Sequence, residues 1–362
     1  MRRVLRPLRR TATAAGGGLR GALYRRRLRS AARGKVALAY GREVPRREEA
    51  AHGGTVKLQA LAETWPQADA FNVLYLVSSA LPPQFERLLD IARKRGAAVV
   101  WNQDGVAYAG WHGPGWERVN ETLATGLHAA DHVFFQSEFC RVSSDRFLGP
   151  CARSSEVLAN PVDTRRFVPS KRRDECPTLL LGGNQYQRYR LEAALRTLEL
   201  LPEEWRLLVT GRLSWDPDPR RVRREAQELL ARPWLSSRVE LVGPYTQAEA
   251  PALFGRAHLL LHTKYNDPCP GTVLEALACG LPVVYSASGG TPELVGDAGV
   301  GVEAALDWEH DHPPDPQELA AAVLDCASRL DGLSAAARAR AERFDVRRWL
   351  ERHRVVFDGL VT

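Results

Sequence analysis

Apolar residues in this chain gather in short runs, which alternate with longer segments of mixed character. The runs FNVLYLV (71–77), AAVVW (97–101), HVFFQ (132–136) and WRLLVTG (205–211) have the length of buried strands. Segments between such runs place apolar residues at helical spacing over about ten to fifteen positions. Strands that alternate with helices of this length predict parallel sheets covered by helices. The expected fold class is therefore α/β.

This alternation occurs twice, with a stretch rich in Pro, Arg and Asp between the two sets, near residues 165–177. A chain of 362 residues is too long for one ordinary core and suits about two domains. We predict two Rossmann-like domains and a final amphipathic helix that packs back toward the first domain. The predicted ranges are an arm over 1–34, the first domain over 35–168, the second over 169–340 and the returning helix over 341–362.

The composition is typical of a soluble globular protein, with 44% apolar and 26% charged residues. No apolar run reaches the ~18–20 residues of a membrane-spanning helix. Six cysteines occur without a C-x-x-C pair, which favours reduced thiols over a disulfide framework or a zinc site. We expect a cytoplasmic protein that needs no metal.

The net charge of +7 is unevenly distributed. Residues 1–35 contain twelve Arg and Lys and no acid, and subtracting these charges leaves −5 for the remaining 327 residues. The mildly acidic body gives no basis for a nucleic-acid partner. The basic arm has three interpretations: a disordered, solvated segment, a contact with nucleic acid, or a contact with an anionic membrane surface, where each basic residue contributes roughly 1 kcal/mol. The third would make the protein peripheral at the inner membrane face.

Two candidate ligand-binding segments follow strands of the predicted first domain. Gly53 and Gly54 open a helix, which would leave N–H groups free for an anion, although a plain turn with a helix cap explains them as well. Asn102 and Asp104 follow the third strand, at the end where parallel sheets bind ligands. Asp104 is a candidate general base or ligand of a sugar hydroxyl, and the alternative is a turn residue before Gly105.

In the predicted second domain, Gly183 and Asn184 follow the strand over 178–181. Arg188 lies at the start of the next helix, followed closely by Arg190. An arginine suits a phosphate ligand because its planar fork donates two hydrogen bonds at once. We therefore expect an anion site at this strand end, with Arg188 as its cation.

The most informative stretch runs from residue 259 to 295. Gly271 and Thr272 begin a helix, whose free N–H groups favour an anion by ~0.3–1 kcal/mol at an exposed site. Thr272 is the expected N-cap, and Glu275 three residues later completes a capping box, so a purely structural role explains Glu275 equally well. Asp267 lies in the preceding loop, where it could accept bonds from sugar hydroxyls or form an Asx-turn.

This stretch, LLLHTKYNDPCPGTVLEALACGLPVVYSASGGTPELV, resembles the donor-site signature of glycosyltransferase family 4, the retaining GT-B enzymes also called glycosyl transferases group 1. The similarity includes an acid-x7-Glu motif, an EAxACGxPVV run and a GGxPELV loop. Weaker similarity extends over roughly residues 35–350. The resemblance implies a GT-B fold, with two Rossmann-like domains whose parallel sheets face across a cleft.

The resemblance also implies residue roles. Glu275 would bind the nucleotide ribose, Asp267 the donor sugar, and the backbone around Gly271 and Thr272 the sugar and diphosphate. Arg188 falls near the family's phosphate-binding lysine.

Three positions depart from the family pattern. Asp267 replaces the usual Glu, Pro270 stands where Gly is common, and Asp104 stands where the family has a His. The first and third departures leave the identity of the sugar and the role of Asp104 open.

The implied activity is hexosyl transfer from a nucleoside diphosphate sugar to an acceptor hydroxyl of a glycan or lipid-linked saccharide, with retention of configuration. Arg188 and the helix start at Thr272 would take the leaving-group charge, so that no metal or other cofactor is required. The acceptor would bind in the first domain, between the glycine pair and Asn102–Asp104. The alternatives are a nucleotide-sugar epimerase or hydrolase on the same fold, and a non-catalytic nucleotide-sugar-binding protein.

Overall fold

The computed structural model describes residues 29–30, 34–49, 51, 53–171, 173–232, 235 and 237–362, with the side chains of 29 and 30 left out. Most of the basic arm, and with it the question of membrane contact, lies outside these residues. No helix in the described ranges is long and apolar enough to cross a bilayer.

The chain forms two compact units, which we describe one at a time. Unit 1 comprises Met1–Arg46, His52–Leu158 and Trp349–Thr362, and unit 2 comprises Arg47–Ala51 and Ala159–Arg348. The sequence placed the division after residue 168 and the returning helix at 341. The structure divides the chain earlier because Val162 and Phe167, although they lie in a polar stretch, are buried in the core of unit 2.

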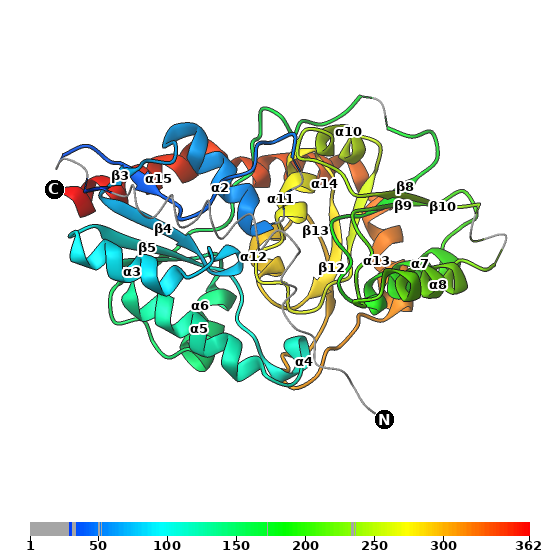
Figure 1. Ribbon diagram of the computed structural model, residues 1–362. Coiled ribbons are helices and arrows are strands. Elements are labelled where there is room, and N and C mark those ends of the chain that lie inside the picture. The colour runs from blue at the N-terminus through cyan, green and yellow to red at the C-terminus, as the bar shows by residue number, and fades with distance from the viewer. Residues whose placement is uncertain are drawn as a thin grey trace. The chain divides into compact units, whose positions relative to one another are not determined.

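Unit 1 contains a five-stranded parallel sheet with strand order β2-β4-β5-β6-β7. Figure 1 shows α2 and α15 over one face of this sheet and α3 and α5 over the other. All residues of β4 and β6 are buried, as expected for strands covered on both faces. The elements are β1 (Arg29–Ser30), β2 (Leu38–Ala39), α2 (Gly53–Thr64), β3 (Ala70–Phe71), β4 (Val73–Val77), the 3-10 helix η1 (Ser78–Ala80), α3 (Phe85–Lys94), β5 (Ala98–Gln103), α4 (Ala109–His112), α5 (Trp116–Ala129), β6 (His132–Phe135), α6 (Glu138–Phe147), β7 (Ser154–Val157) and α15 (Val346–Val361).

Unit 2 contains a six-stranded parallel sheet with strand order β10-β9-β8-β11-β12-β13. The order reverses between β8 and β11, and in open α/β sheets ligands bind at such a switch point. One hydrophobic core includes α7 and α13, and another includes α11 and α14. The elements are β8 (Thr178–Leu181), α7 (Arg188–Leu200), β9 (Arg206–Thr210), α8 (Pro219–Leu229), β10 (Val239–Gly243), α10 (Ala250–Phe254), β11 (Leu259–His262), α11 (Gly271–Ala278), β12 (Val283–Ala287), α12 (Thr291–Val295), β13 (Gly299–Glu303), α13 (Pro316–Ser328) and α14 (Leu330–Glu342).

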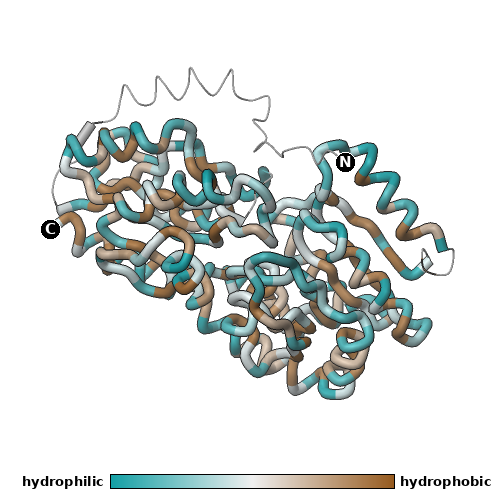
Figure 2. Tube along the Cα trace, turned by 90° about the horizontal axis from the view of Figure 1, so that it is seen from below, coloured by the Kyte–Doolittle hydropathy of each residue, from teal (hydrophilic) through white to brown (hydrophobic). Residues whose placement is uncertain are grey.

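The predicted α/β class with two Rossmann-like parallel sheets is confirmed. Along the tube in Figure 2, apolar residues gather in short brown stretches, and the helical coils change between brown and teal along their turns. β13 was not predicted, because its sequence GVGVE contains too few apolar residues to read as a strand. α10 is short and has Pro251 in its first turn, where a missing N–H costs no helical hydrogen bond.

Candidate functional site

The switch point of unit 2 brings the loop after β8 against the first turn of α11. Gly183 in this loop has a φ of +78°, and a Cβ added there would lie 3.1 Å from Thr272 Cγ2. A side chain at this position would therefore be strained both by its backbone conformation and by its neighbour. The glycine that the sequence singled out lets two segments of the site approach closely.

Asp267 lies in the loop after β11 and is 9% exposed. Its carboxylate is 3.3 Å from His262 Nε2 and 3.2 Å from Lys264 Nζ. Burial by itself would raise the pKa of Asp267, but the charge of Lys264 and the contact with His262 outweigh burial and hold that pKa well below its usual range. Asp267 is therefore an ionised, ion-paired group.

The backbone of Asp267 is held by the loop after β12. Gly290 N–H donates to the Asp267 carbonyl at 2.9 Å, and a Cβ added to Gly289 would lie 2.6 Å from that same oxygen. The GG pair of the family-like GGxPELV segment thus packs directly on the loop that carries Asp267.

Glu275 is buried in α11, and its surroundings correct one prediction. The helix begins at Gly271 with Pro270 as its N-cap and no side-chain cap bond, so the expected Thr272 N-cap and its capping box with Glu275 are wrong. The reason is that Pro270 already has an extended backbone, which starts the helix two residues before the predicted position. Glu275 instead accepts a bond from Gln247 Nε2 at 3.0 Å.

Burial raises the pKa of Glu275 to about 7, although the Gln247 bond and the charge of Arg166 lower it in part. A buried carboxyl group with so perturbed a pKa and no capping role is a candidate ligand-binding group.

Two arginines at the start of α7 differ in their surroundings. Arg188, the predicted phosphate ligand, is exposed. Arg190 is 4% exposed and donates to the Asn184 carbonyl at 2.8 Å, while its buried Nε makes no hydrogen bond in the described part of the chain. Burial lowers the pKa of Arg190, and the nearby charge of Asp267 opposes this effect. Arg190 is thus the arginine with a buried donor still available to a ligand.

Asn184, a predicted ligand, is engaged within its own loop. Its Oδ1 accepts from Arg212 N at 2.8 Å, and its Nδ2 donates to Tyr186 Oη at 3.2 Å.

Sequence reasoning missed the loop after β13, which docks on the Asp267 loop. Tyr265 Oη donates to the Ala305 carbonyl at 2.5 Å, and Asp307 N donates to that Tyr265 oxygen at 2.8 Å. Asp311 in the same loop has a pKa raised to about 6 by burial, against the opposing charge of Lys264. No sequence signal linked residues 305–312 to the site.

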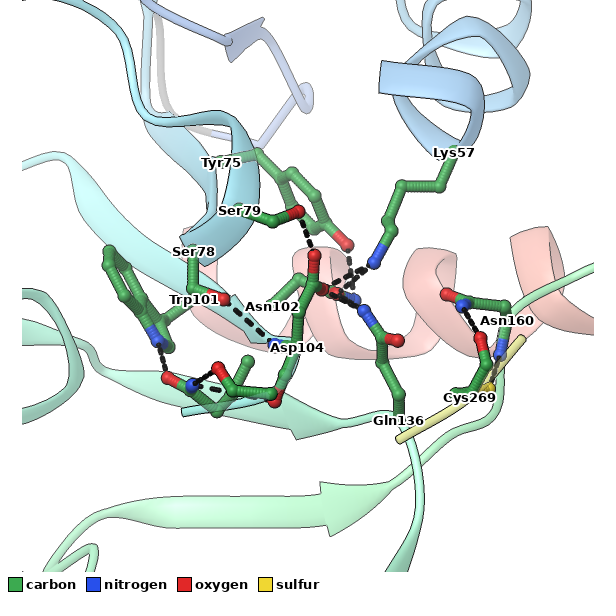
Figure 3. A network of polar contacts seen from close by, with 12 residues as sticks. Lys57, Tyr75, Ser78, Ser79, Trp101, Asn102, Asp104, Gln136, Asn160 and Cys269 are labelled. Carbon is green, nitrogen blue, oxygen red and sulfur yellow. Dashed lines mark hydrogen bonds and ion pairs between the residues drawn. The ribbon is translucent and has the colours of Figure 1, made fainter. Parts of the chain in front are cut away.

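Unit 1 holds a second polar cluster around Asp104, directly after β5 (Figure 3). The Asp104 carboxylate receives Lys57 Nζ at 2.6 Å and also accepts bonds from Gln136 Nε2 and Ser79 Oγ. Its N–H donates to Ser78 Oγ at 2.8 Å. Because these side chains come from separate segments of the chain, a local turn role does not account for Asp104.

The other predicted residues of unit 1 surround this cluster. Asn102 is buried in β5, where its Oδ1 accepts from Lys57 at 2.8 Å and from Gln136 at 3.2 Å. Gly53 and Gly54 begin α2, and a Cβ added to Gly54 would clash with the Ser79 hydroxyl. Lys57 was missed, although a lysine inside the apolar segment VKLQALA was a usable signal.

Within the described residues, no group of three or more His, Cys, Asp or Glu side chains is arranged to hold a metal ion.

Residues 176–329 match the family model described as glycosyl transferases group 1. A curated relative from Arabidopsis thaliana, a component of phosphatidylinositol N-acetylglucosaminyltransferase, is 26% identical over 64% of this chain and 49% of the relative. A D-inositol 3-phosphate glycosyltransferase from Xylanimonas cellulosilytica is 30% identical over 47% of this chain and 39% of the relative. The chain spans about half or less of the length of these relatives.

Solved structures resemble most of this chain. Anabaena Alr3699/HepE in complex with UDP-glucose has a TM-score of 0.60 at 18% identity, covering 80% of this chain and 77% of that one. Sucrose-phosphate synthase from Thermosynechococcus elongatus has a TM-score of 0.65 at 17% identity, covering 84% and 78%. The fold is GT-B. Residues 176–329 are thus similar to the group 1 glycosyltransferases, the family that the 259–295 stretch resembles.

Proposed function

We propose that this protein transfers a hexose from a nucleoside diphosphate sugar to an acceptor hydroxyl of a glycan or lipid-linked saccharide, with retention of configuration. The match of residues 176–329 to the glycosyl transferases group 1 model supports glycosyl transfer, and the similarity to a protein bound to UDP-glucose supports a nucleotide-sugar donor. The observation that carries the proposal is the set of buried ionisable groups at the switch point of unit 2, formed by Glu275, Asp267 and Arg190.

In this proposal Glu275 binds the ribose of the nucleotide. Its carboxyl group is buried in α11, and Gln247 is the neighbour that orients it. A paired ribose diol donates two hydrogen bonds, which favours the ionised form of the carboxyl group. Nucleotide binding should therefore lower the pKa of Glu275 from about 7.

The leaving diphosphate needs positive charge in the transition state. Arg190 offers a buried Nε donor, Arg188 an exposed guanidinium, and the start of α11 the free N–H groups of a helix terminus. Since an oxocarbenium-like transition state gains most from stabilising the departing charge, these groups supply the main rate enhancement. The proposal includes no metal ion, because the chain itself provides the cations.

Retention follows in this proposal if the departing phosphate accepts the proton of the acceptor. The acceptor O–H bond breaks as its oxygen bonds to the anomeric carbon, the bond from that carbon to the phosphate oxygen breaks, and the proton passes to the leaving phosphate. Asp267 then holds the sugar through its hydroxyl groups. The acceptor binds to unit 1, near Asn102 and Asp104.

The test is turnover of UDP-, GDP- and ADP-hexoses with and without a panel of aryl glycosides as acceptors. Sugar transfer that requires the glycoside supports the proposal. Turnover without any acceptor would instead indicate a hydrolase or epimerase, and nucleotide binding without turnover a binding protein. Arg190→Met should reduce transfer about 10- to 100-fold, the range for losing one charge-assisted hydrogen bond, whereas the exposed Arg196→Met on the same helix should not.

We also propose an anionic membrane surface as a partner of the basic arm, on the strength of its sequence alone. Sedimentation with vesicles of anionic lipid should deplete the wild-type chain more than a variant in which Arg25, Arg26 and Arg27 are Gln. Equal sedimentation of the two proteins would contradict the proposal of a membrane partner.

A further inference from the structure

A chain of buried hydrogen bonds in unit 1 connects the C-terminal helix α15 with Asp104. Trp349 O lies 2.8 Å from His353 Nδ1, and His353 Nε2 lies 3.0 Å from Tyr75 Oη. Asn102 Nδ2 is 3.1 Å from that same Tyr75 oxygen. His353, Tyr75 and Asn102 are each at most 1% exposed, so water does not compete for these bonds.

The direction of every bond in this chain follows from its first member. A main-chain carbonyl only accepts, so His353 Nδ1 carries the hydrogen and donates to Trp349 O. Burial lowers the pKa of His353 to about 3, which keeps the ring neutral and leaves Nε2 as an acceptor. Tyr75 therefore donates to His353.

Since the Tyr75 hydrogen is used, its oxygen accepts the bond from Asn102 Nδ2. The Asn102 amide is thereby oriented with Oδ1 toward Lys57, which it contacts at 2.8 Å, and toward Gln136. The side chains of His353, Tyr75 and Asn102 thus connect α15 with Lys57. They orient the Asn102 amide so that its oxygen, and not its nitrogen, faces the lysine.

Lys57 is 3% exposed and divides its donors between Asn102 Oδ1 and Asp104 Oδ1. Gln136 and Lys57 together occupy both lone pairs of Asp104 Oδ1, whereas Oδ2 accepts only from Ser79 within the described residues. The Asp104 side chain remains 13% exposed. One lone pair of Oδ2 is therefore left to accept a hydrogen bond from a ligand (Figure 3).

We propose that Asp104 Oδ2 binds the hydroxyl group of the acceptor, and that Lys57 is the positioning residue that holds Asp104, with His353 and Tyr75 fixing the orientation of Asn102. This inference rests on the proposed glycosyl transfer and adds the acceptor subsite to it. Asp104 orients the hydroxyl and does not remove its proton, because protonating the carboxylate would leave the Lys57 ammonium buried without its counter-charge. The site selects a neutral hydroxyl and rejects an anionic group.

The experiment compares Lys57→Met, Lys57→Arg and the exposed control Lys94→Met, using an aryl glycoside that the wild type glycosylates. Lys57→Met should lower kcat/KM for the acceptor about 10- to 100-fold and leave the affinity for the nucleoside diphosphate within twofold. Lys57→Arg should recover part of the loss. Wild-type transfer by a folded Lys57→Met variant would overturn the inference, whereas a wild type that binds no nucleotide would overturn the proposed function.

Two further measurements separate positioning from folding. The double variant Lys57→Met/Asp104→Asn, which removes both charges, should melt at a higher temperature than Lys57→Met and yet transfer no better. Imidazole carbon NMR shifts, assigned with His353→Gln, should show the Nδ1–H tautomer of His353. The Nε2–H tautomer, or recovery of transfer by the double variant, would overturn the inference whatever the activity of the wild type.

Discussion

Asp104 and Asp267, in the segments that follow β5 and β11, are both paired with a lysine, but the pairs are built differently. Asp267 pairs with Lys264, three residues away, and with His262 at the end of the same strand. Asp104 pairs with Lys57 from α2, forty-seven positions away, and receives bonds from two further segments. The Asp267 carboxylate is thus paired with side chains close to it in the sequence, whereas the Asp104 carboxylate is held by side chains from three distant segments of the unit.

This difference predicts unequal consequences when each lysine is removed. Lys57→Met should destabilise unit 1 by about 3–5 kcal/mol, because it leaves a charge uncompensated beside a buried cluster. Lys264→Met should cost about 1 kcal/mol or less, since Lys264 is 20% exposed and Asp267 retains His262. Urea denaturation of both variants measures the two losses in the free energy of unfolding. Equal losses would contradict the difference between the two ion pairs.

The two acids of unit 2 should respond to pH in opposite ways. The folded pKa of Glu275 is raised to about 7, so its carboxyl group binds more protons in the folded state, and stability should fall as pH rises from about 4.5 to 7. The size is ~1.4 kcal/mol per pKa unit. Asp267 has a lowered pKa, so its contribution is present above about 4 and is lost on acidification.

Glu275→Gln should remove the decline between pH 4.5 and 7, measured as the free energy of unfolding against pH without nucleotide. Glu192→Gln, at a half-buried carboxylate on α7, serves as the control and should retain the decline. An unchanged pH profile in Glu275→Gln would show that its carboxyl group is not desolvated.

The glycines at the start of α2 test how tightly the Asp104 cluster is packed. Gly54→Ala places a Cβ against Ser79 Oγ, so the hydroxyl that donates to Asp104 must move. We expect a loss of ~1–3 kcal/mol in thermal or urea unfolding. Gly53→Ala has open space around its Cβ and should be neutral or slightly stabilising, so that similar losses in both variants would contradict this packing.

A small effect on stability is expected from Asp267→Glu, which introduces the acid more common in the family that this stretch resembles. One added methylene in this buried loop should cost less than ~1.5 kcal/mol, because the charge and both partners remain. Its expected effect is instead on the relative kcat/KM of different donor sugars. An unchanged preference among donor sugars would contradict the assignment of Asp267 to the sugar site.

The same comparison explains what the sequence could reveal. Asp267, Gly271, Glu275 and the GG loop lie in one contiguous stretch, so their proximity was readable from spacing and family resemblance. The Thr272 cap failed because capping rules describe local preferences, and the extended backbone of Pro270 began the helix earlier. The alternation of strands and helices and the two-sheet fold followed from periodicity, which local sequence does record.

The Asp104 cluster could not be predicted from the sequence in this way. Lys57, Ser79 and Gln136 come from α2, η1 and the end of β6, and only the folded sheet brings them to one carboxylate. Arg190 is likewise a stronger candidate phosphate ligand than Arg188 only because α7 buries Arg190 and leaves Arg188 exposed. Such contacts depend on tertiary packing between distant segments, which cannot be read from the local pattern of a single sequence.

The most direct test of the account is calorimetric titration of UDP, GDP and ADP into the wild type, Glu275→Gln and the control Glu192→Gln. The account predicts that one nucleoside diphosphate binds the wild type and the control equally, and binds Glu275→Gln about 10- to 100-fold more weakly, because the ribose loses its charged acceptor. Equal affinity for all three proteins, or no binding of any nucleotide to the wild type, would contradict the assignment of the switch point of unit 2 as the donor site.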